Sequence, residues 1–188
     1  MANLISILRI FIAFWAIGLL FAQSYIWALI LTIIAFAMDG LDGWVARKLN
    51  ETSGLGAVLD IMGDRIVEAS YWIAFAALGR LSVLFPLICV TRAFVTDSLR
   101  SVALSQGYTA FGEKSMQSSK IGYFICSSKF MRISYAVAKV LAFILLIAAQ
   151  IYPVLYIPAL TFACAAVIFC VVRALPVIFE SGKLFRHD

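Results

Sequence analysis

Residues 39–64 read DGLDGWVARKLNETSGLGAVLDIMGD and place four aspartates in a chain that otherwise consists largely of apolar runs. Asp39 and Asp42 are three residues apart at the end of one run, and Asp60 and Asp64 are four apart at the start of the next. On helices, each pair shares a face. Unneutralised aspartates at bilayer depth cost about 2.5–3.5 kcal/mol each on insertion scales. The sequence therefore predicts that these aspartates bind cations.

Small residues separate the two pairs and predict that two helix backbones approach closely there. They are Gly40, Gly43, Ala46, Gly54, Gly56 and Ala57. A short polar link, residues 48–53, would join the two helices. Each helix would then present two carboxylates to a shared cleft.

The composition is typical of an integral membrane protein. Of 188 residues, 64% are hydrophobic and 13% are charged, whereas charged residues make up about a quarter of soluble domains. No Pro-, Gly- or Ser-rich linker divides the chain, so we predict one all-α domain over residues 1–188. The net charge of +5 indicates cytoplasmic loops and contact with anionic membrane lipids, not nucleic acid.

The cysteines and the histidine offer little catalytic chemistry. The four cysteines form no C-x-x-C pair, and at least three lie in apolar runs, where they behave as small hydrophobic residues. His187, the single histidine, is next to the last residue. A Ser/His/Asp triad and a thiolate metal site are therefore not expected.

Six apolar runs predict six membrane-spanning helices. A short amphipathic helix on the membrane surface is expected before the first span. We prefer an uncleaved first span to a signal peptide, because many spans follow it. The long polar stretch 107–129 separates the fourth span from the fifth. The predicted spans are residues 10–22, 25–45, 55–78, 81–104, 133–152 and 154–172.

The distribution of positive charge predicts the orientation. Six spans place both termini on one side of the membrane, and the opposite side holds only Arg80. The segments on the first side contain Arg47, Lys48, Lys114, Lys120, Lys129, Arg132, Lys183 and Arg186. By the positive-inside rule that side is cytoplasmic. The aspartates would then lie at the cytoplasmic end of spans two and three.

The ligand chemistry of the aspartates favours magnesium or manganese. Carboxylates without a nearby histidine or thiolate suit Mg²⁺ or Mn²⁺ better than zinc. Four carboxylates can hold two ions about 4 Å apart, a spacing that clamps the attacking and leaving oxygens in phosphoryl transfer. Arg47 could hold a phosphate bidentately. The alternative is a set of intramembrane ion pairs that only holds the helices together.

The spacing of these residues resembles the signature of the CDP-alcohol phosphotransferase (phosphatidyltransferase) family. The pattern is Asp39-x-x-Asp42-Gly43-x-x-Ala46-Arg47, then eight residues, then Gly56-x-x-x-Asp60-x-x-x-Asp64. The six expected spans, the surface helix and the polar residues Asn3, Ser6 and Arg9 extend the resemblance over the whole chain.

This resemblance implies a reaction and a role for each motif residue. An alcohol would attack the lipid-bearing phosphorus of CDP-diacylglycerol in a homodimeric membrane enzyme, and CMP would leave. Asp39, Asp42 and Asp60 would hold metal ions and the diphosphate, and Asp64 would contact the second metal and act as the base. The nucleotide site would be lined by Gly43, Ala46, Arg47 and Gly56.

The acceptor is expected to be a small anionic alcohol. Arg92 and Arg100 are eight residues apart and lie nearly on one helical face, and Lys129 and Arg132 follow the polar stretch. This arrangement resembles phosphatidylglycerophosphate synthases, whose acceptor is glycerol 3-phosphate. The sequence differs from the pattern of these synthases at two places, Ala93 and residues 129–132. An inositol-phosphate, serine or phosphatidylglycerol acceptor therefore stays open.

Two other classes of protein compete with this prediction. A divalent-cation transporter could also place carboxylates between membrane helices. Internal repeats and broken mid-membrane helices, which many transporters have, are not evident here. A catalytically inert assembly subunit would be expected to lack at least one of the four aspartates, and all are present.

Overall fold

The computed structural model describes residues 2–49, 54–108 and 119–183 of the chain. Within these segments it describes the side chains of residues 6–40, 56, 58–108, 119, 122–126 and 128–182. Every regular element in the described residues is a helix. The prediction of an all-α fold is therefore confirmed.

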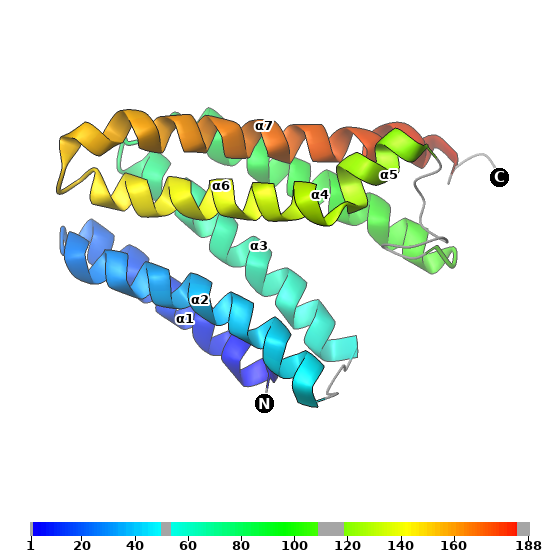
Figure 1. Cartoon of the computed structure of the whole chain (residues 1–188), viewed down its shortest axis with the longest axis horizontal. Helices are drawn as coiled ribbons and strands as arrows, with labels where there is room; N and C mark the ends of the chain where they lie inside the picture. Colours follow the sequence, from blue (N-terminus) through cyan, green and yellow to red (C-terminus); the bar gives the residue numbers. More distant parts are fainter. Residues whose placement is uncertain (1, 50–53, 109–118, 184–188) are drawn as a thin grey trace. The chain divides into compact units, whose positions relative to one another are not determined.

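Seven α-helices and two short 3-10 helices follow one another along the described chain (Figure 1). The long helices have 20 to 25 residues each. Their bounds are α1 Ala2–Phe21, α2 Tyr25–Leu49, α3 Gly54–Ala77, α4 Leu84–Ser105, α5 Lys120–Ser127, α6 Lys129–Ala148 and α7 Tyr156–Glu180, with η1 Pro153–Leu155 and η2 Ser181–Lys183.

The six long helices match the six predicted apolar runs, with shifted ends. α2 begins where the second run was predicted but continues to Leu49, and α7 continues to Glu180, well beyond the predicted end at residue 172. α7 passes through Pro176 without a break. The length of the apolar runs therefore located the helices but not their ends.

One expectation about short helices was wrong. We expected a separate surface helix before residue 10, but α1 is continuous from Ala2 to Phe21. No proline or glycine interrupts residues 2–17, so the backbone has no reason to break there. A further short helix, α5, lies inside the long polar stretch, for which no helix was predicted. Its N-cap is Ser119, whose hydroxyl accepts a hydrogen bond from the backbone N–H of Gly122.

Within the described residues, two helical stretches are long and apolar enough by themselves to cross a membrane. They are Gly122–Ala148 and Pro153–Glu180. Shorter apolar helical stretches occupy Ser6–Phe21 and Tyr25–Gly40. Membrane crossing by the other long helices, and hence the six-span topology, stays a prediction.

The helices form two compact units. Unit 1 comprises residues 1–83 and 140–160, and unit 2 comprises residues 84–139 and 161–188. α6 and α7 each contribute residues to both units. The expected single domain over residues 1–188 stays a prediction.

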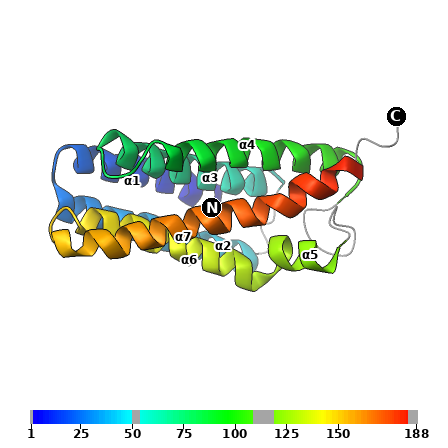
Figure 2. The same cartoon turned by 90° about the horizontal axis from the view of Figure 1, so that it is seen from above.

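In unit 1, α1 packs against both α2 and α3. A short turn joins α1 to α2 (Figure 2). Small and apolar residues are buried on these two helices, among them Ala13, Ala16, Leu20, Ala28 and Ala35. The predicted role of Gly40 in close helix packing is wrong, since a Cβ built there would meet nothing within 4 Å.

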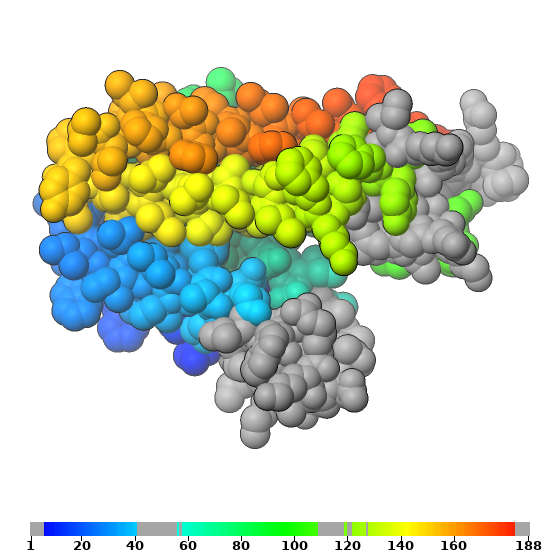
Figure 3. Space-filling view, in the orientation of Figure 1, coloured from blue at the N-terminus to red at the C-terminus, as the bar shows by residue number. Residues whose placement is uncertain are grey.

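An aromatic cluster fills the core of unit 1. Phe143 of α6 is fully buried, and its ring centroid lies 4.7 Å from that of Trp72 and 5.1 Å from that of Tyr71. Phe36 of α2 lies 6.0 Å from Phe143, and Figure 3 shows α2 in blue beside this part of α6 in yellow. The buried Tyr71 hydroxyl shares a 2.7 Å hydrogen bond with the Thr32 hydroxyl, so its polar atom is satisfied.

Replacing Phe143 by alanine is expected to lower the free energy of unfolding by about 3–5 kcal/mol, because the cluster would lose its central ring and leave a cavity. Denaturant unfolding of the detergent-solubilised protein measures the change. Phe130→Ala, on the exposed start of the same helix, is the control and should change stability little. A loss for Phe143→Ala no larger than that for Phe130→Ala would contradict the assignment of this cluster as the core.

In unit 2, α5 packs against the C-terminal end of α7. The Ser119 hydroxyl donates a 2.5 Å hydrogen bond to Oε1 of Glu180. A Cβ at Gly122 would collide with Glu180 and lie 2.7 Å from the Ser119 hydroxyl, so glycine is required for this close approach. Cys126, Ala103 and Val177 form a small buried cluster beside it.

Candidate active site

Three of the four motif aspartates come together in unit 1. Asp39 lies in the C-terminal half of α2, and Asp60 and Asp64 lie one helical turn apart in α3. One carboxylate oxygen from each residue can be chosen so that all three lie within 4.8 Å of one another. We call these residues the aspartate group. Helical spacing therefore did place Asp60 and Asp64 on one face, and that face meets Asp39.

The aspartate group is open to its surroundings. The exposed fraction of the side chain is 42% for Asp39, 53% for Asp60 and 46% for Asp64. A soluble or headgroup ligand can therefore reach the carboxylates without local unfolding.

Arg9 of α1 supplies a cation to all three aspartates. Its Nη1 atom pairs with Asp39 and lies 2.9 Å from Oδ1 of Asp64, and its Nη2 atom lies 3.8 Å from Oδ1 of Asp60. The Arg9 side chain is only 3% exposed. Among the described residues, its Nε and Nη2 atoms have no hydrogen-bond partner. One buried guanidinium therefore lies beside three carboxylates.

The donor atoms of the aspartate group fit a hard divalent cation. The group consists of carboxylate oxygens alone, and Mg²⁺ and Mn²⁺ prefer such ligands. The described residues thus gather a site that could hold a metal ion.

Several predicted site residues lie outside the described side chains. Asp42, Gly43, Ala46 and Arg47 belong to the described helix α2, but their side chains are not described. Gly56 lies in the first turn of α3, four residues before Asp60. The expected roles of these residues in holding the nucleotide stay predictions.

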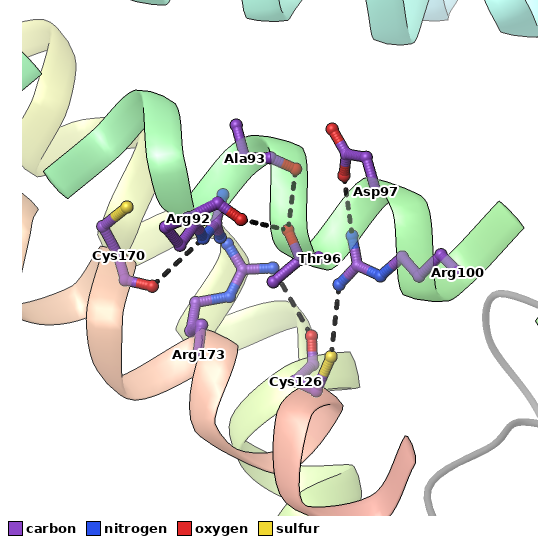
Figure 4. A network of polar contacts seen from close by, with 8 residues as sticks. All are labelled: Arg92, Ala93, Thr96, Asp97, Arg100, Cys126, Cys170 and Arg173. Carbon is purple, nitrogen blue, oxygen red and sulfur yellow. Dashed lines mark hydrogen bonds and ion pairs between the residues drawn. The ribbon is translucent and has the colours of Figure 1, made fainter. Parts of the chain in front are cut away.

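Unit 2 contains a second group of charged residues, which lie on α4 and α7 and contact Cys126 of α5 (Figure 4). Arg92 is buried, and its Nε donates a 3.2 Å hydrogen bond to the carbonyl of Cys170. Arg173 donates a 3.4 Å hydrogen bond to the carbonyl of Cys126. Arg100 donates to the Cys126 sulfur at 3.4 Å and lies 3.9 Å from Asp97.

Three of the cations in unit 2 lie close to one tyrosine ring. Guanidinium carbons of Arg92 and Arg173 lie 5.8 Å and 5.6 Å from the ring centroid of Tyr135, and the Lys139 ammonium lies 5.4 Å from it. Within the described residues, Nη1 of Arg92 and Nε of Arg173 are buried without a hydrogen-bond partner. Like charges held this close favour binding of an anion.

The predicted acceptor residues all belong to unit 2. Arg92 contacts α7 and Arg100 contacts α5, and their predicted position on one face of α4 stays a prediction. Lys129 is exposed and Arg132 is half-buried in the first turn of α6. Sequence reasoning missed Arg173, although an arginine inside the apolar run of α7 was a visible signal. It also missed the contact of Arg9 with the aspartates.

A comparison with known protein families identified a match. The family model described as CDP-alcohol phosphatidyltransferase matches residues 1–172. This match includes both the aspartate group and most of the cations of unit 2.

Individual relatives differ in the acceptor that their names specify. A probable CDP-diacylglycerol–inositol 3-phosphatidyltransferase of Arabidopsis thaliana is 32% identical over 83 residues, which are 44% of this chain and 36% of the relative. A CDP-diacylglycerol–glycerol-3-phosphate 3-phosphatidyltransferase of Aquifex aeolicus is 33% identical over 64 residues, 34% of this chain and 36% of the relative. A putative cardiolipin synthase of Mycobacterium tuberculosis is 29% identical over 109 residues, 57% of this chain and 52% of the relative. The matched segments thus span between about a third and a half of these relatives.

Proposed function

Because the chain belongs to the CDP-alcohol phosphatidyltransferase family, we propose that it transfers the phosphatidyl group of CDP-diacylglycerol to an alcohol and releases CMP. The observation that carries this proposal is the aspartate group, in which carboxylates from α2 and α3 meet at the spacing of the family signature. A divalent ion held there would neutralise the diphosphate and stabilise the charge that develops on departing CMP.

Each motif residue has a role in this proposal. Asp39, Asp42 and Asp60 bind Mg²⁺ or Mn²⁺ together with the diphosphate, and Asp64 accepts the proton of the attacking hydroxyl. The new bond joins the alcohol oxygen to the lipid-bearing phosphorus, and the bond from that phosphorus to CMP breaks. Gly43, Ala46, Arg47 and Gly56 line the nucleotide site.

The proposed protein is a homodimer that crosses the membrane six times, with both termini and the aspartate group on the cytoplasmic side. The long apolar helices of the described chain support membrane insertion. The excess of Lys and Arg on one side of the predicted spans supports the orientation.

We propose glycerol 3-phosphate as the acceptor, so that the product is phosphatidylglycerophosphate. The cations of unit 2 support an acceptor that carries its own phosphate, because buried arginines with free N–H groups suit a charged oxygen ligand. The names of several relatives support this acceptor. Other relatives are named for inositol or as cardiolipin synthases, so inositol phosphates and phosphatidylglycerol are the alternatives.

A CMP-release assay with a panel of acceptors tests the proposal. The purified protein in lipid nanodiscs receives CDP-diacylglycerol, Mg²⁺ and one of glycerol 3-phosphate, inositol 1-phosphate, inositol, serine or phosphatidylglycerol. We expect CMP release and a phosphatidylglycerophosphate product with glycerol 3-phosphate. If CMP is released only with another acceptor, the proposed acceptor is wrong but the proposed reaction stands. If no acceptor leads to CMP release, the proposed activity is contradicted.

Arg100→Ala is expected to raise the KM for glycerol 3-phosphate by about one to two decades, since a charge-assisted hydrogen bond to phosphate contributes about 1.5–3 kcal/mol. The KM for CDP-diacylglycerol should stay nearly unchanged. Steady-state CMP release, with each substrate varied in turn, measures both constants.

The control for this variant is Arg80→Ala, which removes an exposed arginine of unit 1. It should leave both constants near the wild-type values. If Arg100→Ala instead weakens CDP-diacylglycerol binding while the acceptor KM holds, Arg100 belongs to the donor site, and the argument for an anionic acceptor loses its main support.

A further inference from the structure

We infer that Arg9 is a built-in counter-ion of the aspartate group that competes with the metal ion for the three carboxylates. The inference rests on the proposed function, since it takes the aspartate group to be the metal site. It assigns to an α1 residue the control of metal affinity.

The guanidinium of Arg9 lies beside all three carboxylates of the aspartate group. Nη1 pairs with Asp39 and with Asp64, and Nη2 lies 3.8 Å from Asp60, so one planar group reaches all three carboxylates. The three ligand oxygens lie within 4.8 Å of one another, and a divalent ion bound there would draw on the same three carboxylates. The two cations therefore compete for the negative charge of the aspartate group.

The Arg9 side chain is buried, whereas the aspartate side chains are partly exposed. The Arg9 side chain is 3% exposed, whereas the aspartates are about half exposed. Such a buried guanidinium depends on its carboxylates for neutralisation, because water does not screen it. The metal can approach from the exposed side of the aspartates, but it meets a fixed positive charge behind them. Metal binding must therefore overcome the attraction between Arg9 and the aspartates.

The surroundings of Arg9 show how it is held. A Cβ built at Gly63 of α3 would lie 2.9 Å from Nη2 of Arg9, and otherwise only in ordinary contact with Ile10. The missing side chain at Gly63 thus leaves the space in which the guanidinium lies. Substitution of Gly63 by alanine would push the end of a flexible side chain, so the guanidinium would shift while the charges stay the same.

The test is Mn²⁺ binding to the purified full-length protein without nucleotide, followed by electron paramagnetic resonance of free Mn²⁺. For Arg9→Gln we expect the Kd for Mn²⁺ to fall by about one to two decades, the factor expected when a competing charge-assisted contact is removed. The thermal midpoint of the same variant in EDTA should fall, because the aspartates lose their cation. A residue that merely supports the fold would weaken both properties.

Two further variants make the result specific. Gly63→Ala is expected to lower the Kd for Mn²⁺ by a smaller factor, since it displaces the guanidinium without removing it. Arg80→Gln makes the same change of charge at an exposed arginine and should leave the Kd unchanged. If Arg9→Gln does not fold, the Gly63→Ala variant decides the question alone.

The outcomes separate this inference from the proposed function. If the wild-type protein binds Mn²⁺ but Arg9→Gln or Gly63→Ala binds it no more tightly, Arg9 does not compete with the metal and the inference is overturned. If the wild-type protein and all variants bind no Mn²⁺, the metal site itself is wrong, and the inference falls with it.

Discussion

In excess EDTA, CMP release from CDP-diacylglycerol should fall to background, and Mg²⁺ or Mn²⁺ added beyond the chelator should restore it. The physical reason is the charge balance of the aspartate group. Three carboxylates lie beside Arg9, and carboxylates without bound metal would repel the diphosphate of the donor. Bound divalent ions would turn this repulsion into attraction.

The choice of ion is part of the same expectation. The aspartate group holds carboxylate oxygens alone, and octahedral oxygen sites favour Mg²⁺ or Mn²⁺. Zinc prefers nitrogen and sulfur ligands, which this group lacks, and should restore little activity. Steady-state CMP release measures the recovery, with the preformed Mg²⁺–EDTA complex as the control for direct inhibition by the chelator.

This experiment also separates an enzyme from a cation transporter. A transporter would need the ion but would release no CMP at any ion concentration. Full activity in excess EDTA would contradict the metal role of the aspartates.

The fold class followed from apolar run length, and the pairing of Asp60 with Asp64 followed from helical spacing. Both properties are local, because the helical period fixes which side chains share a face. The close approach of Asp39 was predicted from the idea that α2 and α3 present their carboxylates to one cleft. Gly40, which we expected to serve that approach, has open space beside it.

The missed features depend on contacts between distant segments. Arg9 precedes Asp60 by about fifty residues, and nothing in its local sequence states that α1 packs on both α2 and α3. Likewise, the contact of Arg173 with Cys126 depends on the rotation of α7 relative to α5. The length of an apolar run and the spacing of its residues do not predict which helix it packs against or how it is rotated about its axis.

The helix α5 was missed for a different reason. Its eight residues, KIGYFICS, are too few for a periodic pattern to stand out. The local signal was Ser119 as an N-cap, whereas Gly122 lies where α5 meets Glu180. A search for capping residues would have found its start, whereas the contact with α7 is again a tertiary feature.

Asp60→Asn is expected to abolish both metal binding and turnover. The amide oxygen of asparagine is a weaker metal ligand than a carboxylate oxygen, and the substitution removes one negative charge from the aspartate group. Mn²⁺ binding and CMP release measure the two losses. Glu180→Gln, the same acid-to-amide change at the end of α7 in unit 2, is the control and should retain Mn²⁺ binding.

Asp64→Asn should separate binding from chemistry. The variant keeps Asp39 and Asp60 as ligands, so CDP-diacylglycerol binding should be largely retained. Its turnover should fall by about 10²–10⁴-fold, the usual contribution of a general base. Donor binding by calorimetry and single-turnover CMP release test the two halves of this expectation.

The contrast between Asp60→Asn and Asp64→Asn tests the assignment of the base, because both variants make the same chemical change one helical turn apart in α3. If Asp64→Asn lost donor binding together with turnover, Asp64 would act chiefly as a metal ligand. If it kept near-normal turnover, the proton of the acceptor hydroxyl would have to leave by another route. In that case Arg9, which lies 2.9 Å from Asp64, would mark this carboxylate as its ion-pair partner rather than as the base.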